Sequence, residues 1–195
     1  MSILKDLRML SRKQGSVEDI AEFTKQLHNE SNDRGAALLA VTNADVALSA
    51  ALYQRLRIGE AKREEFDKLG GPLETFSQRI MMGEVLQIYG PDTKYNLDLL
   101  RLLRNTFAHA HIPVTFETKE IAASIQLFKP LPLKLPHAVG ADAKPVPAGS
   151  RDRFLHHCEI VTHNLGVWAF YGVLPVSEVH LPPGYFAFSQ PKPMP

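Results

Sequence analysis

The sequence has a single cysteine, Cys158, among its 195 residues. One cysteine cannot form a disulfide within the chain, and a chain so poor in cysteine is typical of a reducing compartment. The first residues, MSILKDLR, also lack the apolar stretch of a secretory signal peptide. From these two absences we expect a cytoplasmic protein.

An uninterrupted apolar run long enough to cross a membrane is absent as well. The longest candidate, residues 35–53, is broken by Asn43 and Asp45 and is rich in alanine. An aspartate at the centre of a spanning helix costs about 3 kcal/mol on insertion scales. We therefore predict a helix buried in a protein core and no membrane partner.

Charge of one sign is not in excess either, since 22 basic residues face 21 acidic ones and the net charge is +1. Proteins that grip duplex DNA gain most of their affinity from basic groups on phosphates, so this balance disfavours a stand-alone DNA binder. No Gly-Lys-Ser/Thr follows the Gly70-Gly71 pair, and no two histidines have the four-residue spacing of a helical zinc clamp. We expect no cofactor and no metal.

What the sequence does contain is helical periodicity, bounded by capping residues and prolines. It predicts six helices, at 17–29, 33–57, 72–89, 95–109, 118–127 and 151–173, with Ser16, Asp33 and Ser150 as N-caps. A short extended piece is expected at 114–116. Prolines recur over 128–149 and again over 176–195, which indicates a long loop and a C-terminal tail. The expected fold is an all-α, up-and-down bundle forming one domain over residues 1–175.

The predicted helix 95–109 divides into two sides at 100° per residue. One side carries Asp98, Arg101, Arg104, Asn105, Ala108 and His109. The other carries Leu99, Leu100, Leu102, Leu103, Thr106 and Phe107. This division predicts that Arg104 and His109 lie on the polar face of the helix and not in the core.

Arg104 and His109 are five residues apart, so a regular helix separates them by roughly 140°. Either the helix frays at Thr106-Phe107, or a second copy related by a two-fold axis supplies one of the two groups. An imidazole can take a proton from a ribose 2′-OH or protonate the leaving oxygen, and a guanidinium can stabilise the charge on phosphorus. The alternative reading is structural: an Arg and a His near a helix C-terminus often cap carbonyls.

A second candidate cluster involves Arg79, which lies among apolar residues of the predicted helix 72–89. A buried guanidinium needs a carboxylate partner. Asp45, on the helix 33–57, is the first candidate for that partner and Asp98 is the second. An internal salt bridge between two helices is the favoured interpretation, and a direct role in contacting substrate is the alternative. An acidic group of this cluster that lies near Arg104 or His109 would support that site by tuning the histidine.

The segment RNTFAH, from Arg104 to His109, resembles the signature of the HEPN superfamily, which has an Arg, a polar residue after it and a His several positions on. The segments GPLETFSQRI, at 71–80, and DLLRLLRN, at 98–105, resemble the mannitol operon repressor (MltR-like) family, as does DRGAA at 33–37. The resemblance covers about residues 16–175.

The resemblance implies a HEPN-like bundle that forms a homodimer. In active HEPN proteins it also implies metal-independent ribonuclease chemistry, with Arg104 and His109 in the place of the motif residues. The MltR-like family is named for repression, yet no helix-turn-helix is evident in this sequence. Three functions follow as hypotheses: a regulator that binds RNA or another nucleic acid through a dimer groove, an endoribonuclease, and a non-catalytic module that binds a regulatory protein.

Overall fold

The structure, a computed structural model, describes residues 22–23, 25–27, 29–132 and 146–171. These residues form helices joined by turns and contain no strand. The all-α prediction is therefore confirmed for the described part of the chain, and residues 114–116 pair with no strand. Most of the expected loop 128–149, the tail 176–195 and the start of the helix 17–29 lie outside the described residues.

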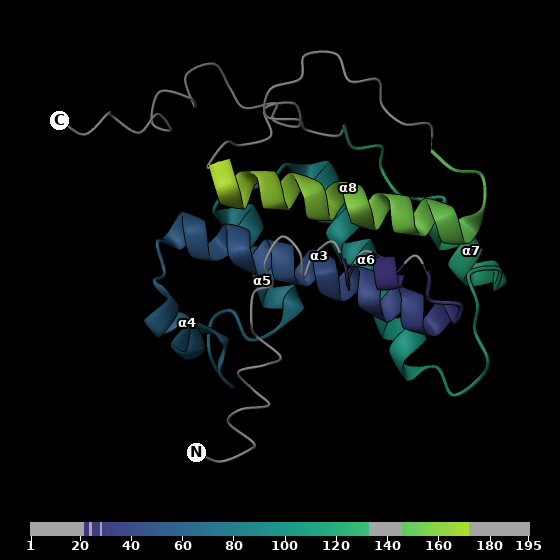
Figure 1. The fold of residues 1–195 in the computed structure, drawn as a ribbon, viewed down its shortest axis with the longest axis horizontal. Coiled ribbons are helices and arrows are strands. Elements are labelled where there is room, and N and C mark those ends of the chain that lie inside the picture. Colours follow the sequence, from purple (N-terminus) through teal and green to yellow (C-terminus); the bar gives the residue numbers. More distant parts are fainter. Residues whose placement is uncertain (1–21, 24, 28, 133–145, 172–195) are drawn as a thin grey trace.

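Two long helices form the centre of the fold, α3 (Asp33–Leu56) and α8 (Ser150–Tyr171). They lie side by side and begin at the same end of the molecule (Figure 1), where Arg151 forms an ion pair with Asp33. The buried face of α3 is built largely from small side chains: Ala36, Ala37, Ala40, Ala44 and Ala51. Small residues let two helix axes approach closely, which explains why this alanine-rich helix takes the central position.

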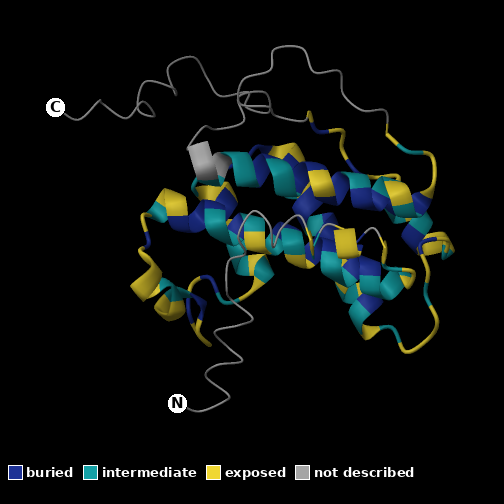
Figure 2. Ribbon diagram, viewed as in Figure 1, coloured by how far each residue is buried: buried dark blue, intermediate teal, exposed yellow. Residues whose placement is uncertain are grey.

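The remaining helices surround this pair. The helices α5 (Phe76–Val85) and α6 (Pro91–His109) pack against α3 and against each other. The short helix α7 (Lys119–Ile125) contacts α6 and α8, whereas α4 (Glu60–Asp67) lies at the opposite end of the molecule (Figure 1). Buried residues concentrate along α3 and α8, and α4 is largely exposed (Figure 2).

Several predicted helix boundaries are wrong, each for a local reason. The N-cap of α3 is Asn32 and not Asp33, because the Asn32 side chain accepts from the amides of Arg34 and Gly35. The helix predicted to start at Pro72 begins only at Phe76, where Thr75 and Gln78 form a reciprocal capping box.

The helix predicted over 95–109 starts four residues earlier, at Pro91, because Pro is well tolerated in the first turn of a helix. Its predicted end at His109 is confirmed. The helix expected at 118–127 shortens to the bounds of α7, with Thr118 as its N-cap. Helix α4 was not predicted, since Phe66 is its only large apolar residue and gives no periodic stripe. Ser150 is the first helical residue of α8 and not its N-cap.

By length and composition alone, α3 is apolar enough to cross a membrane, with a mean hydropathy of 1.5 over its most apolar window. In this structure it is packed against α5, α6 and α8. Its face toward them is closed by Ala37, Ala44, Leu48 and Leu52, each fully buried. The arrangement is that of a central core helix.

Candidate functional site

The side chains of Arg104 and His109 are exposed on α6, and Asn105 between them is partly buried. The opposite side of the helix is anchored in the core by Leu100, Leu103 and Phe107, which are at most 4% exposed. The predicted placement of the Arg and the His on the polar side of α6 is therefore confirmed. Both side chains can reach a ligand in solvent.

The predicted division of α6 is wrong at two positions. Leu102 is 54% exposed and Thr106 is exposed as well, although both were expected on the buried side. The helices that pack against α6 cover only part of the side on which its apolar residues lie. As a result, Leu102 and Thr106 lie on the open surface with Arg104 and His109, which makes that surface partly apolar.

Helix α6 stays regular through its last turn. Its final amide–carbonyl bond joins Ala110 N to Thr106 O at 3.0 Å, and His109 is the last helical residue. The alternative in which the helix frays at Thr106-Phe107 is thereby excluded for this structure. On a regular helix, Arg104 and His109 remain roughly 140° apart, so one chain does not converge both groups on a single phosphate.

Three aromatic rings hold the last turn of α6 in place. Phe107 packs against Phe116 with ring centroids 5.0 Å apart, and Phe116 packs against Phe154 of α8 at 5.1 Å. All three rings are buried to 1% exposure or less. The backbone that carries His109 is therefore attached to the core on one side and open to solvent on the other.

The predicted pair between Arg79 and Asp45 is present. Arg79 Nη1 donates to both carboxylate oxygens of Asp45, at 2.8 and 2.9 Å, and its Nη2 donates to the Glu74 carbonyl at 3.3 Å. Burial raises the pKa of Asp45 above its usual value, and the positive charge of Arg79 opposes that rise. This ion pair joins α3 to α5.

Arg104 belongs to the same electrostatic cluster as this pair. Its positive charge lies near enough to Asp45 to lower the pKa of that carboxyl, after the larger effects of burial and Arg79. The Arg104 guanidinium also donates from Nη1 to Asn105 Oδ1 at 3.2 Å. Asp45 is thus bonded to one guanidinium in the helix interface and also feels the charge of a second one at the surface.

The cluster extends further inward through residues that the sequence reasoning missed. The Asp67 carboxylate lies 3.9 Å from Arg79 Nη2 and accepts a hydrogen bond from the Tyr53 hydroxyl. Burial, followed by this bond to Asp67, raises the pKa of Tyr53. A buried aspartate needs such partners, but nothing in the spacing of Tyr53 and Asp67 along the chain signals that they meet.

Asp98 is not a partner of Arg79. It pairs instead with Lys94 at 3.0 Å and, more loosely, with Arg101 at 3.7 Å, and Lys94 also reaches Glu84 of α5 at 3.8 Å. Lys94, Asp98 and Arg101 are about one-third exposed and Glu84 about half, and ion pairs at such exposure contribute little stability. Arg101 shares the Asp98 carboxylate with Lys94 and is partly buried, whereas Arg104 is exposed, so Arg104 is the more accessible cation on this face.

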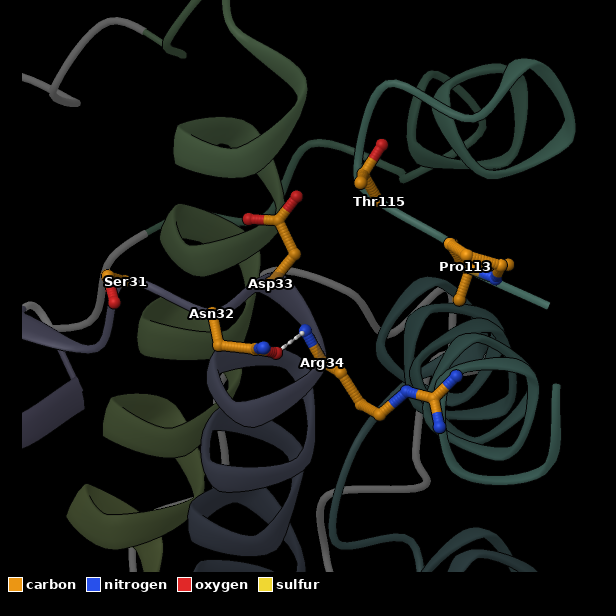
Figure 3. A pocket seen from close by; sticks show the side chains of 7 residues that line it. Ser31, Asn32, Asp33, Arg34, Pro113 and Thr115 are labelled. Carbon is orange, nitrogen blue, oxygen red and sulfur yellow. Dashed lines mark hydrogen bonds between the residues drawn. The ribbon is translucent and has the colours of Figure 1, made fainter. Parts of the chain in front are cut away.

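A hollow among the described residues lies between the start of α3 and the segment that follows α6. It has a volume of about 510 Å³ and is lined by residues 31–34, at the start of α3, and 113–115, in the segment after α6 (Figure 3). Arg104 and His109 do not line it. The candidate site is therefore separate from this hollow.

Other candidate chemistry from the sequence is not assembled. Among the described residues, no three His, Cys, Asp or Glu side chains gather where they could hold a metal ion. Cys158 is fully buried, and burial raises the pKa of its thiol, which disfavours the reactive thiolate. His157 is also buried and stacks on the Phe128 ring with centroids 4.6 Å apart.

Comparisons with protein families, with curated proteins and with solved structures find no match to this chain. The resemblance to the MltR-like family and the HEPN superfamily thus rests on the sequence motifs alone. The function is inferred below from the site itself.

Proposed function

We propose that this protein is a small regulatory protein that binds RNA through the exposed surface of α6, acting as a homodimer on a HEPN-like, MltR-like scaffold in the cytoplasm. Arg104 and His109 would contact the phosphate backbone, and Asn105 would orient Arg104. The observation that carries the proposal is that α6 buries Leu103 and Phe107 while leaving Arg104 and His109 open to solvent.

The chemistry of this surface suits single-stranded RNA better than duplex DNA. A guanidinium and an imidazole on a partly apolar surface can bind a phosphate and also lie against an unstacked base. Arg104 and His109 are only two basic groups, which suits contact with a short stretch of RNA, whereas tight binding of duplex DNA needs many phosphate contacts.

A homodimer is proposed because it would reconcile the geometry of α6 with a site that uses both Arg104 and His109. Because the helix is regular, Arg104 and His109 of one chain diverge, and a two-fold axis beside α6 would bring the Arg of one copy near the His of the other. The exposed Leu102 supplies an apolar contact on this surface, and it would meet its own mate if the axis passed beside it. Substitution of Leu102 by Glu should then give a monomer with weaker RNA binding.

The direct test is a gel-shift titration of the purified protein against a 20-nucleotide single-stranded RNA in EDTA. Arg104→Gln and His109→Ala should each weaken binding about tenfold or more, the loss of roughly one charge-assisted contact. Lys62→Gln, an exposed cation lost from the distant α4, is the matched control and should change affinity less than twofold. Equal losses from all three variants would refute a specific site on α6.

Metal-independent cleavage of RNA is the second candidate function. The exposure of both Arg104 and His109 favours it, since a dimer would let them act on one phosphate. In that reaction the 2′-oxygen bonds to phosphorus and the bond from phosphorus to the 5′-oxygen breaks. Neutral His109 would take the proton of the 2′-OH, and the imidazolium so formed would give it to the leaving 5′-oxygen, directly or through water. The Arg104 guanidinium would stabilise the charge that builds on the phosphoryl oxygens.

Incubation of the same RNA with the wild-type protein in EDTA distinguishes the two functions. Cleavage would give fragments with 2′,3′-cyclic phosphate ends, and His109→Ala should abolish them. Intact RNA that is nevertheless shifted on a gel supports the binding function. A protein that neither shifts nor cuts RNA, but retains a protein partner that Arg104→Glu releases, would support the non-catalytic module instead.

A further inference from the structure

The side chains of Asp33 and Arg34, at the start of α3, contact the segment that follows α6. The Arg34 guanidinium donates from Nη2 to the Ala110 carbonyl at 2.9 Å and, at 3.4 Å, to the Ile112 carbonyl. These contacts join residues that are 76 and 78 positions apart in the chain. The two acceptor carbonyls belong to residues one and three positions after His109, the last residue of α6.

Ala110 is the residue whose own amide completes the last hydrogen bond of α6, to Thr106 O. Its carbonyl has no partner within the helix, as is usual at a helix C-terminus. Arg34 supplies that partner and adds a positive charge at the negative end of the helix dipole, where a cation is favourable. The Arg34 contact therefore stabilises the turn of α6 that carries His109.

Asp33 holds the other end of the same segment. Its Oδ2 accepts from the Phe116 amide at 3.0 Å, and its Oδ1 accepts from Arg151 of α8. The two neighbouring side chains diverge from the start of α3, so that they grip the 110–116 segment at two places (Figure 3). Phe116 then packs on Phe107, which anchors the preceding turn of α6.

From this geometry we propose that Arg34 is a positioning residue for His109. It touches no RNA in this role and acts by fixing the backbone at Ala110 and Ile112, so that the Cα–Cβ bond of His109 keeps one direction relative to Arg104. The role in RNA binding rests on the proposed function above. The effect of Arg34 on the last turn of α6 does not depend on that function, and it is measured without RNA.

The contacts of Arg34 with the carbonyls of Ala110 and Ile112 are called the Arg34 clamp below. Hydrogen exchange followed by NMR tests this clamp in the RNA-free protein. Arg34→Gln should speed exchange of the Ala110 amide about tenfold or more and should move the His109 ring signal toward the position seen in a short peptide. Exchange of the Leu100 and Leu103 amides should not change. Arg34→Lys keeps a cationic donor and should restore at least part of the protection.

Arg55 offers a matched control, because it lies on the same helix and donates to a distant backbone carbonyl, that of Leu86, at 3.4 Å. Arg55→Gln should leave both the Ala110 amide and the His109 signal as they are. If Arg34→Gln leaves them unchanged as well, or if Arg55→Gln disturbs them equally, the clamp is refuted.

The RNA titration then separates the two proposals. With the clamp established, Arg34→Gln should weaken RNA binding about fivefold or more, and Arg34→Lys should recover part of the loss. Wild-type affinity in Arg34→Gln, despite fast exchange at Ala110, would overturn the positioning role. Wild-type protein that binds no RNA would refute the proposed function, while the exchange data would still decide whether Arg34 holds His109.

Discussion

Arg79 Nη1 lies 2.8 and 2.9 Å from the two carboxylate oxygens of Asp45, and this single nitrogen joins helix α5 to the central helix α3. The two side chains are only 15% and 26% exposed. Around them lie Asp67 on the inner side and Arg104 toward the surface. The pair therefore holds α3 and α5 together and also interacts electrostatically with Arg104 of the candidate site.

Removal of one member of this pair should be costly. Asp45→Asn leaves the Arg79 guanidinium partly buried with a weaker partner, and we expect the free energy of unfolding to fall by about 2–4 kcal/mol. Asp98→Asn, which breaks only ion pairs that are about one-third exposed, should cost less than about 1 kcal/mol. Urea denaturation of both variants measures the difference. Equal costs would show that the Asp45 pair is no more important than a surface contact.

Leu102 and Leu103 are neighbours in the sequence, but they differ sharply in burial, at 54% and 4% exposed. Leu103→Ala should destabilise the protein by about 2–4 kcal/mol, because it leaves a cavity in the core. Leu102→Ala should change stability by less than about 0.5 kcal/mol when measured on the monomer at low protein concentration. Thermal denaturation of both variants tests which side of α6 is buried. A reversed order would contradict the fold described here.

His157 should make stability depend on pH. Burial, followed by the charges of His156 and Arg153, lowers its pKa from 6.5 to about 4. The unfolded chain therefore binds a proton between pH 6.5 and 4 that the folded protein does not. Stability from this group is fully present above pH 6.5 and falls as the pH drops toward 4, by up to about 3 kcal/mol.

His157→Phe should remove this contribution while keeping a ring on Phe128. Denaturation of the wild type and the variant at pH 7.5 and pH 4.5 gives the comparison. Carboxylates titrate in both proteins, so only the difference in their pH dependence reports on His157. The variant should lose less stability on acidification than the wild type does, and identical losses would mean that His157 is not held neutral.

Two glycines in helices should respond to alanine in opposite directions. A Cβ at Gly83 would lie 2.6 Å from the buried ring of Tyr89, whose hydroxyl donates to the Ile80 carbonyl at 2.6 Å. Gly83→Ala should therefore destabilise the protein by about 1–3 kcal/mol. Nothing lies within 4 Å of a Cβ at Gly166 in α8, so Gly166→Ala should stabilise it by about 0.5–1 kcal/mol.

Thermal melting of both glycine variants measures the two effects side by side. Tyr89→Leu in the Gly83→Ala background should recover part of the loss if the clash is with the ring. A destabilisation that persists unchanged in the double variant would place the strain in the backbone of α5 instead.

Much of the candidate site was predictable from the sequence, because it depends on local periodicity. Arg104 and His109 fall on the polar side of any helix that buries Leu103 and Phe107, and one apolar stripe suffices to show it. The Arg79–Asp45 pair was predictable as well, since an arginine among apolar residues requires a carboxylate. The exposure of Leu102 was not, because periodicity gives the order of residues around a helix and not the sector that its neighbours cover.

The sequence by itself determined that this protein is helical, where α6 ends, and that α6 carries an Arg and a His on its polar side. Those properties follow from propensities, caps and spacing within one segment. Only the tertiary structure decided that Tyr53 meets Asp67 and that Arg34 binds the carbonyl of Ala110. Such contacts join residues far apart in the chain, and their partners are chosen by how helices pack, which no local pattern records.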